Sequence, residues 1–204
     1  MVENNDIVIV PGDISWGLTL ADALPDLLFL NSLKGRKIIG KGNHDFWWST
    51  LTKINNVFSA NGINSIDILH NNAYALGNMI IAGTRGWYNE PSRQTSVQNS
   101  PDYDKIIARE TTRLKISLDA AVKLRDVNSA DKLPIVVFLH FPPVWSGFVC
   151  REIVDMLHKY EIKKCYFGHI HGNYNIPRTF VFDDVTFELI SSDFIDFTPQ
   201  PVII

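Results

Sequence analysis

Cysteine and net charge are both scarce in this sequence, and each scarcity excludes a class of protein. Only two cysteines, Cys150 and Cys165, occur among the 204 residues, which is too few for a secreted disulfide scaffold and lacks the spacing of a zinc site. We therefore expect two buried thiols in a reducing compartment. The 19 basic and 22 acidic residues give a net charge of −3, which argues against binding of duplex nucleic acid through a broad basic surface.

Signals for membrane insertion, export and two common kinds of active site are also absent. No apolar run approaches the roughly 18 residues that a membrane-spanning helix requires, and the N-terminus has no basic segment followed by an apolar stretch. We therefore expect a cytoplasmic protein with no membrane partner. The sequence contains neither a Gly-x-Ser-x-Gly elbow nor a Walker loop, so serine-based acyl transfer and nucleotide binding through a P-loop are unsupported.

The sequence does contain an alternation of strand and helix patterns. Short runs rich in β-branched residues and bounded by turn residues predict four buried strands of parallel type, at residues 7–10, 37–39, 135–139 and 165–167. Ser100 followed by Pro101 predicts the start of the longest helix. With no repeat or linker in sight, these elements predict a single α/β domain over residues 1–204.

Two pairs of shorter runs predict antiparallel hairpins. One hairpin is expected to pair residues 66–69 with residues 78–82, and the other to pair residues 179–182 with residues 185–189. The second pair is joined by Asp183 and Asp184, and both acids are explained by turn chemistry without a metal ion.

Residues that bind metal ions or protons follow each of the four buried strands. In chain order they are Asp13, then Asn43, His44 and Asp45, then His140, and finally His169 and His171. Because ligands in α/β sheets bind beyond the carboxyl ends of the strands, we expect these side chains to meet on one rim.

Taken alone, most of these motifs have a plain structural alternative. The Gly12-Asp13 step is compatible with a turn that caps a helix, and Gly42-Asn43 with a left-handed turn. His140 is compatible with a hydrogen-bonded core histidine. His169 and His171, two residues apart between glycines, are harder to explain without a task. The motifs together, in this order, favour a functional site.

The remaining histidines and the aromatic residues near the motifs have structural explanations. His70 precedes two asparagines and is assigned to a turn, and His158 lies near a helix end, where positive charge suits the helix dipole. Arg85 is either a phosphate contact or an ordinary surface arginine. Four tryptophans close to the motifs either line a substrate pocket or pack beneath the rim: Trp47, Trp48, Trp87 and Trp145.

The ligand types define the chemistry of the expected site. Carboxylate, amide and imidazole groups without a thiolate select a divalent ion such as manganese, iron, cobalt or zinc. A pair of such ions about 3.5–4 Å apart activates water and clamps a phosphoryl group. The motifs therefore favour hydrolysis of a phosphate ester.

The order of the motifs resembles that of the calcineurin-like metallophosphoesterase family. The local sequence is also similar to that of uncharacterised bacterial predicted phosphohydrolases in three segments, Gly12 to Gly17, Lys41 to Trp48 and Gly83 to Trp87. The resemblance implies an α/β fold, a two-sheet β-sandwich of mixed sheets flanked by helices. It also implies two divalent ions, with manganese preferred and iron, zinc or cobalt as alternatives. In this reading Asp13 bridges the ions, one of which is completed by Asn43, His140 and His169 and the other bound by His171.

The resemblance further implies that His44 protonates the leaving group while Asp45 holds its imidazole. One family motif is not found here: the family opens with a strand ending in Asp-x-His, which supplies two ligands to the ion bound by His171. Residues 1–11 contain Asp6 and no histidine. We therefore expect an N-terminally truncated domain without its first strand, either as a fragment or as a natural variant.

Two functions follow from this reading. The first is a phosphoesterase in which metal-activated water attacks a phosphate-ester substrate and a histidine acts as general acid. The alternative is an inactive scaffold or binding module that keeps the fold. Because the ligands for one ion are present and those for the other are incomplete, we expect one tightly bound ion and impaired turnover.

Overall fold

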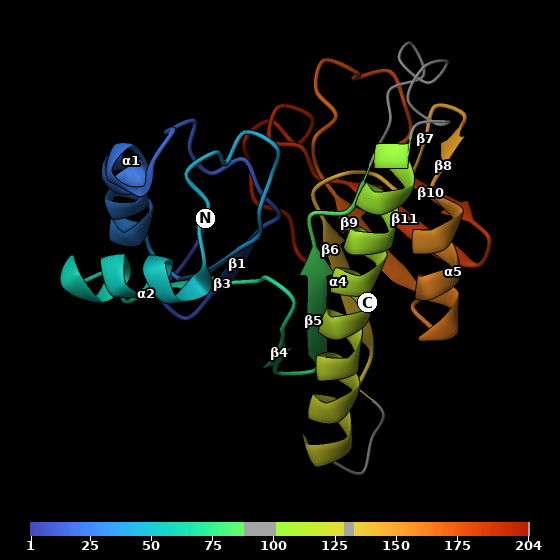
Figure 1. Ribbon diagram of the computed structural model, residues 1–204, viewed down its shortest axis with the longest axis horizontal. Helices are drawn as coiled ribbons and strands as arrows, with labels where there is room; N and C mark the ends of the chain where they lie inside the picture. The colour runs from blue at the N-terminus through green and yellow to red at the C-terminus, as the bar shows by residue number, and fades with distance from the viewer. Residues whose placement is uncertain (88–100, 129–132, 204) are drawn as a thin grey trace.

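The computed structural model describes residues 1–87, 101–128 and 133–203 of the chain. Two sheets pack face to face, and a pair of helices covers the outer side of each (Figure 1). The expected α/β fold, a sandwich of two sheets flanked by helices, is confirmed. Within the described residues, no helix has the length and apolar character needed to cross a membrane.

The first sheet is small and parallel. Its strands lie in the order β1-β2-β3 and are β1 (Ile7–Val10), β2 (Arg36–Ile39) and β3 (Ile66–Ile68). Helices α1 (Leu20–Ser32) and α2 (Leu51–Ala60) cover its outer face. A capping box between Thr19 and Asp22 starts α1, because each residue satisfies a backbone N–H that the first helical turn leaves free.

The second sheet has six strands in the order β10-β11-β9-β6-β5-β4. They are β4 (Ala73–Leu76), β5 (Met79–Thr84), β6 (Ile135–Leu139), β9 (Lys164–Phe167), β10 (Thr179–Phe182) and β11 (Val185–Leu189). The four inner strands run parallel, and an antiparallel strand closes each edge. Helices α4 (Pro101–Asn128) and α5 (Arg151–Lys159) cover the outer face, and a small hairpin joins β7 (Val144–Trp145) to β8 (Phe148–Val149).

Strand β6 shows why the inner strands are apolar throughout. Val136 and Phe138 face the first sheet, whereas Val137 and Leu139 face the helices α4 and α5. Successive side chains of a strand point to opposite faces, and both faces of this strand are buried. An uninterrupted apolar run at residues 135–139 is therefore the expected pattern for a strand in this position.

All four strands predicted from the sequence are present, and so is the hairpin of β10 and β11. The expected burial is wrong for β1, because it lies at the edge of the first sheet, with Ile7 exposed and the other three residues half-buried. Asp183 and Asp184 both have positive φ angles at its tip, as a tight hairpin turn requires. The two cysteines are free and buried, as expected. The longest helix begins at Pro101, and its expected cap, Ser100, lies outside the described residues.

The other predicted hairpin is wrong. Residues 66–68 form β3, which pairs in parallel with β2, and β5 pairs instead with β4. Leu76 lies opposite Met79, so Gly77 and Asn78 form a two-residue turn, and Gly77 has the positive φ angle that favours glycine. The error came from missing the strand β4 and giving its place beside β5 to residues 66–69, and Asn78, assigned to a strand, belongs to the turn.

Lys37, at the start of β2, is a fully buried lysine. Its ammonium group donates hydrogen bonds to the carbonyl oxygens of Leu33 at 2.7 Å and Gly35 at 2.8 Å. These carbonyls follow the C-terminus of α1, where backbone acceptors have no partner within the helix. Lys37 therefore ties the end of α1 to the first sheet, and burial lowers the pKa of its ammonium group.

Replacing Lys37 by methionine is expected to lower the free energy of unfolding by about 1–3 kcal/mol, because the carbonyl oxygens of Leu33 and Gly35 lose a charged hydrogen-bond donor. Urea unfolding followed by circular dichroism measures this. The control is Lys34→Met, since Lys34 forms only an exposed ion pair with Glu3 and such pairs contribute about 1 kcal/mol or less. Equal effects of the two substitutions would contradict the capping role.

Candidate metal centre

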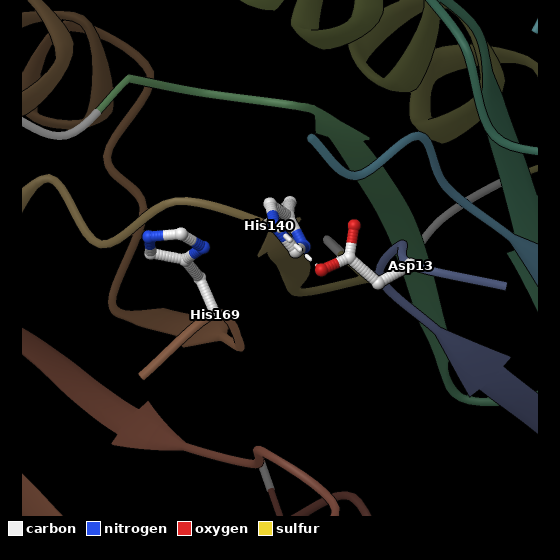
Figure 2. A group of neighbouring side chains, drawn as sticks. All are labelled: Asp13, His140 and His169. Atoms are coloured by element: carbon white, nitrogen blue, oxygen red, sulfur yellow. Dashed lines mark ion pairs between the residues drawn. The ribbon is translucent and has the colours of Figure 1, made fainter. Parts of the chain in front are cut away.

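Four side chains from four strand ends converge on one point of the rim. Nε2 of His140 lies 2.7 Å from Oδ1 of Asn43 and 3.5 Å from Oδ2 of Asp13. Nδ1 of His169 lies 2.9 Å from the same Asn43 oxygen. Figure 2 shows Asp13, His140 and His169, whose ligand atoms all lie within 4.8 Å of one another. The structure thus brings together the four residues expected to bind the first ion.

These distances suit a divalent ion. Two ligand atoms bound about 2.1 Å from an ion at right angles lie about 3 Å apart, which is the spacing of the Asn43 oxygen from the two imidazole nitrogens. The ring of His140 also bonds to the backbone of Pro11, and such a bond fixes the orientation of a ligating imidazole. The donor set is carboxylate, amide and imidazole, which fits manganese, iron, cobalt or zinc.

Two glycines allow the loops that carry Asp13 and Asn43 to touch. A Cβ atom on Gly12 would lie 2.5 Å from the backbone nitrogen of Gly42 and 2.8 Å from Nδ1 of His140. A Cβ atom on Gly42 would lie 1.9 Å from Oδ1 of Asp13. Any side chain at either position would therefore push the candidate ligands apart.

Two of the candidate ligands have unusual backbone conformations. Asp13 has a φ angle of 57° and His169 one of 69°, both in the left-handed region that residues other than glycine rarely occupy. Such conformations cost free energy and persist where surrounding contacts enforce them, often at functional sites.

The carboxylate of Asp45 enforces the conformation around Asp13. Its oxygens accept hydrogen bonds from the backbone nitrogens of Asp13, Ile14 and Ser15 at 2.8, 2.8 and 3.1 Å. They also accept from the backbone nitrogen of Gly42 at 2.7 Å and from the indole of Trp47 at 3.0 Å. Asp45 is only 1% exposed, so this one buried carboxylate joins the loop after β1 to the loop after β2.

Burial shifts the pKa values of three candidate ligands in the direction that favours the uncharged form of each side chain. Desolvation lowers the pKa of His140 to about 3 and that of His169 to about 4, with charge repulsion between histidines adding to both shifts. Desolvation also raises the pKa of Asp13. Neutral imidazoles are the form that binds metal ions, so both histidines are ready to act as ligands well below neutral pH.

His44 lies beside the four residues without joining them. Its backbone nitrogen donates to Oδ1 of Asp13 at 2.9 Å, while its ring stacks on the indole of Trp16 with centroids 4.1 Å and planes 3° apart. Phe46 meets the imidazole edge-on at 6.1 Å. Within the described part of the chain, no hydrogen bond joins Asp45 to this ring, because the Asp45 oxygens are engaged by the five donors above.

His171 lies close enough to the converging side chains for its charge to act on Asp13, His140 and His169, but its imidazole contacts Asp193. Its Nδ1 lies 2.7 Å from Oδ1 of Asp193, and its side chain is 56% exposed. Asp193 also accepts hydrogen bonds from the backbone nitrogen of Gly172 and the hydroxyl of Tyr174. The sequence reasoning did not single out Asp193, although it follows β11 as the other motif residues follow their strands.

Most aromatic residues near the motifs pack beneath the rim. Trp47 is 2% exposed and bonds to Asp45, and Trp87 packs on Phe141. Two aromatic residues of the motifs are exposed, Trp16 at 70% and Phe46 at 58%, and the sequence analysis assigned no role to Trp16. Its position directly after the Gly-Asp-Ile-Ser turn was the available signal.

Basic residues also gather near the site. Arg85 is not an ordinary surface arginine, since its side chain is 19% exposed and pairs with the buried Glu110. Burial lowers the pKa of Lys41, and the positive charges of Arg85 and Arg113 lower it further. His70 makes the expected turn contact, with its backbone nitrogen donating to Asn72.

The substitution Asp45→Asn tests the role of the carboxylate. An amide has one acceptor oxygen and would turn its NH₂ group toward backbone donors, so we expect unfolding free energy to fall by about 2–4 kcal/mol. Urea unfolding measures it, with Asp67→Asn as the control, because Asp67 forms an exposed pair with Arg36. Wild-type stability with lost turnover would instead support a role for Asp45 in holding the imidazole of His44.

Comparison with known proteins agrees with this geometry. The chain matches the family model described as calcineurin-like phosphoesterase over residues 2–173, a span that contains all seven candidate site residues. A search of curated proteins finds no match to the chain. The family match covers most of the sequence, and metal dependence is a property of this family that the converging side chains fit. The chain belongs to the calcineurin-like phosphoesterase family.

Proposed function

We propose that the protein hydrolyses a phosphate ester with one divalent ion held by Asp13, Asn43, His140 and His169, manganese being preferred. The observation that supports this is the convergence of four ligand-type atoms from four strand ends at spacings that suit an ion. When bound, the ion supplies a Lewis acid that lowers the pKa of water and neutralises phosphoryl oxygens.

The proposal gives the surrounding residues distinct tasks. The imidazole of His44 donates a proton to the departing oxygen, as a general acid beside the phosphate. Trp16 and Phe46 hold the plane of that ring through their stacked and edge-on contacts. Asp45 holds the two loops, and thereby the carboxylate of Asp13, in place. The alternative hypothesis is a non-catalytic scaffold, and it assigns no function to an imidazole that is oriented in this way.

The first test is the metal content of the protein. We expect about one tightly bound manganese ion per chain after gel filtration, measured by mass spectrometry. His140→Ala removes a ligand and should weaken binding beyond the 10–100-fold that loss of an outer-shell partner costs. His171→Ala is the matched control. This variant should retain the ion, since the imidazole of His171 contacts the carboxylate of Asp193 in the wild-type protein. Two tightly held ions per chain would contradict the proposed site.

The second test separates proton donation from the other tasks. An alkyl phosphate needs protonation of its leaving oxygen, whereas p-nitrophenyl phosphate has a leaving group that departs as an anion. With added manganese, His44→Ala should lower kcat for the alkyl ester by about 10²–10⁴-fold and for the aryl ester far less.

The matched control for this test is Leu18→Ala. Leu18 is 73% exposed in the same loop as Trp16, so the substitution reports on disturbance of the loop alone and should leave both rates unchanged. Equal losses on both esters in His44→Ala would exclude the general-acid role. Full activity in both His44→Ala and Asp13→Ala would overturn the phosphoesterase proposal.

A further inference from the structure

Three arginines converge on a single buried carboxylate at the edge of the metal centre. Oε1 of Glu110 lies 2.7 Å from Nη1 of Arg113, 3.4 Å from Nη2 of Arg85 and 3.6 Å from Nε of Arg109. The Glu110 side chain is fully buried, whereas those of Arg85, Arg113 and Arg109 are 19%, 32% and 54% exposed. We call these three residues the arginine cluster.

Counted over the described residues, the charges of this region do not balance. The arginine cluster and Lys41 carry four positive charges, and the described acids that act on Lys41 are Glu110 and Asp45, which leaves an excess of two. Among the described residues, Nε of Arg85 and Oε2 of Glu110 are buried without hydrogen-bond partners. Partly buried charges are normally paired, so the contacts among the described residues neither neutralise nor close the arginine cluster.

The arginine cluster borders the metal centre. The carbonyl oxygen of Arg85 accepts hydrogen bonds from the backbone nitrogens of His140 at 3.1 Å and Phe141 at 2.8 Å. The guanidinium of Arg85 lies 5.7 Å from the centre of the Phe141 ring, and that ring lies 4.5 Å from the ring of His169. Lys41 precedes Asn43 by two residues.

The fold explains how helix residues reach this place. Glu110, Arg109 and Arg113 lie in the N-terminal half of α4, which runs beside β5 with that half near the carboxyl end of the strand (Figure 1). Arg85 directly follows β5. The helix therefore carries two arginines to the same rim that holds the candidate metal ligands.

We propose that the arginine cluster and Lys41 bind a second phosphoryl group of the substrate, so that the preferred substrates are phosphate esters with two phosphoryl groups. The statement that the bound molecule is a substrate rests on the proposed phosphoesterase function, whereas the binding site itself does not. Guanidinium groups match phosphate oxygens in geometry and charge. An incoming phosphoryl group also supplies the negative charge that the region lacks.

Direct binding tests the site without any hydrolysis. Inorganic pyrophosphate is titrated into chelator-treated, metal-free protein by isothermal titration calorimetry, so that the metal centre contributes nothing. We expect binding that weakens about 10-fold or more in Arg113→Gln. Arg109→Gln removes a more exposed arginine that is 3.6 Å from Glu110 and should also weaken binding, which keeps the test decisive if Arg113→Gln unfolds.

The matched control is Lys115→Gln. Lys115 lies on the same helix and pairs with Asp119, so this substitution removes the same charge outside the arginine cluster and should leave pyrophosphate binding unchanged. No binding to the wild-type protein would overturn the site. An equal loss of pyrophosphate affinity in Lys115→Gln would overturn the site as well, since that result would show that pyrophosphate responds only to the overall charge of the protein.

Steady-state kinetics with manganese then connect the site to the substrate. Arg109→Gln should raise KM for an aryl diphosphate ester about 10-fold and leave KM for the corresponding aryl monophosphate unchanged. Equal effects on both esters would overturn the substrate assignment. Pyrophosphate binding without hydrolysis of either ester would overturn the proposed function while supporting the anion site.

Discussion

The buried carboxylate of Asp45 is the interaction on which the candidate site depends. It joins three successive backbone nitrogens after β1 to one after β2 and to the indole of Trp47. A single buried carboxylate that accepts five hydrogen bonds contributes more to stability than five separate hydrogen bonds between neutral groups. It holds Asp13 in a left-handed conformation that the residue would not keep alone.

The metal centre follows from this clamp and from the direction of the strands. Asn43 follows β2 of the first sheet, whereas His140 and His169 follow the neighbouring parallel strands β6 and β9 of the second sheet. Because ligands bind beyond the carboxyl ends of parallel strands, the strand ends of both sheets bring these side chains to one rim. Gly12 and Gly42 let the first two loops approach to a distance that any side chain would prevent. Burial then keeps both imidazoles neutral, which leaves their nitrogens available to an ion.

Around the centre, contacts divide the chemistry between different residues. Trp16 and Phe46 contact the imidazole of His44, so aromatic packing orients the proposed proton donor. On another side, Arg85 connects the candidate ligand His140 to the arginine cluster, because its carbonyl oxygen accepts a hydrogen bond from the backbone nitrogen of His140. A phosphoryl group at the proposed ion would thus have the proposed proton donor and an excess of positive charge as neighbours, and both assist ester hydrolysis by an activated water.

The sequence alone indicated four parallel strands, one hairpin and, among its seven candidate residues, the four that converge, because apolar runs and motif order report strands and strand ends directly. Tertiary structure decided that β3 pairs with β2 and β4 with β5, since the apolar run at residues 66–69 is compatible with either sheet. The bonding of Asp45, the stack of Trp16 on His44 and the gathering of arginines at Glu110 also depended on tertiary structure. Each joins residues from separate elements, and no local pattern encodes which distant partner a carboxylate, an indole or a guanidinium will meet.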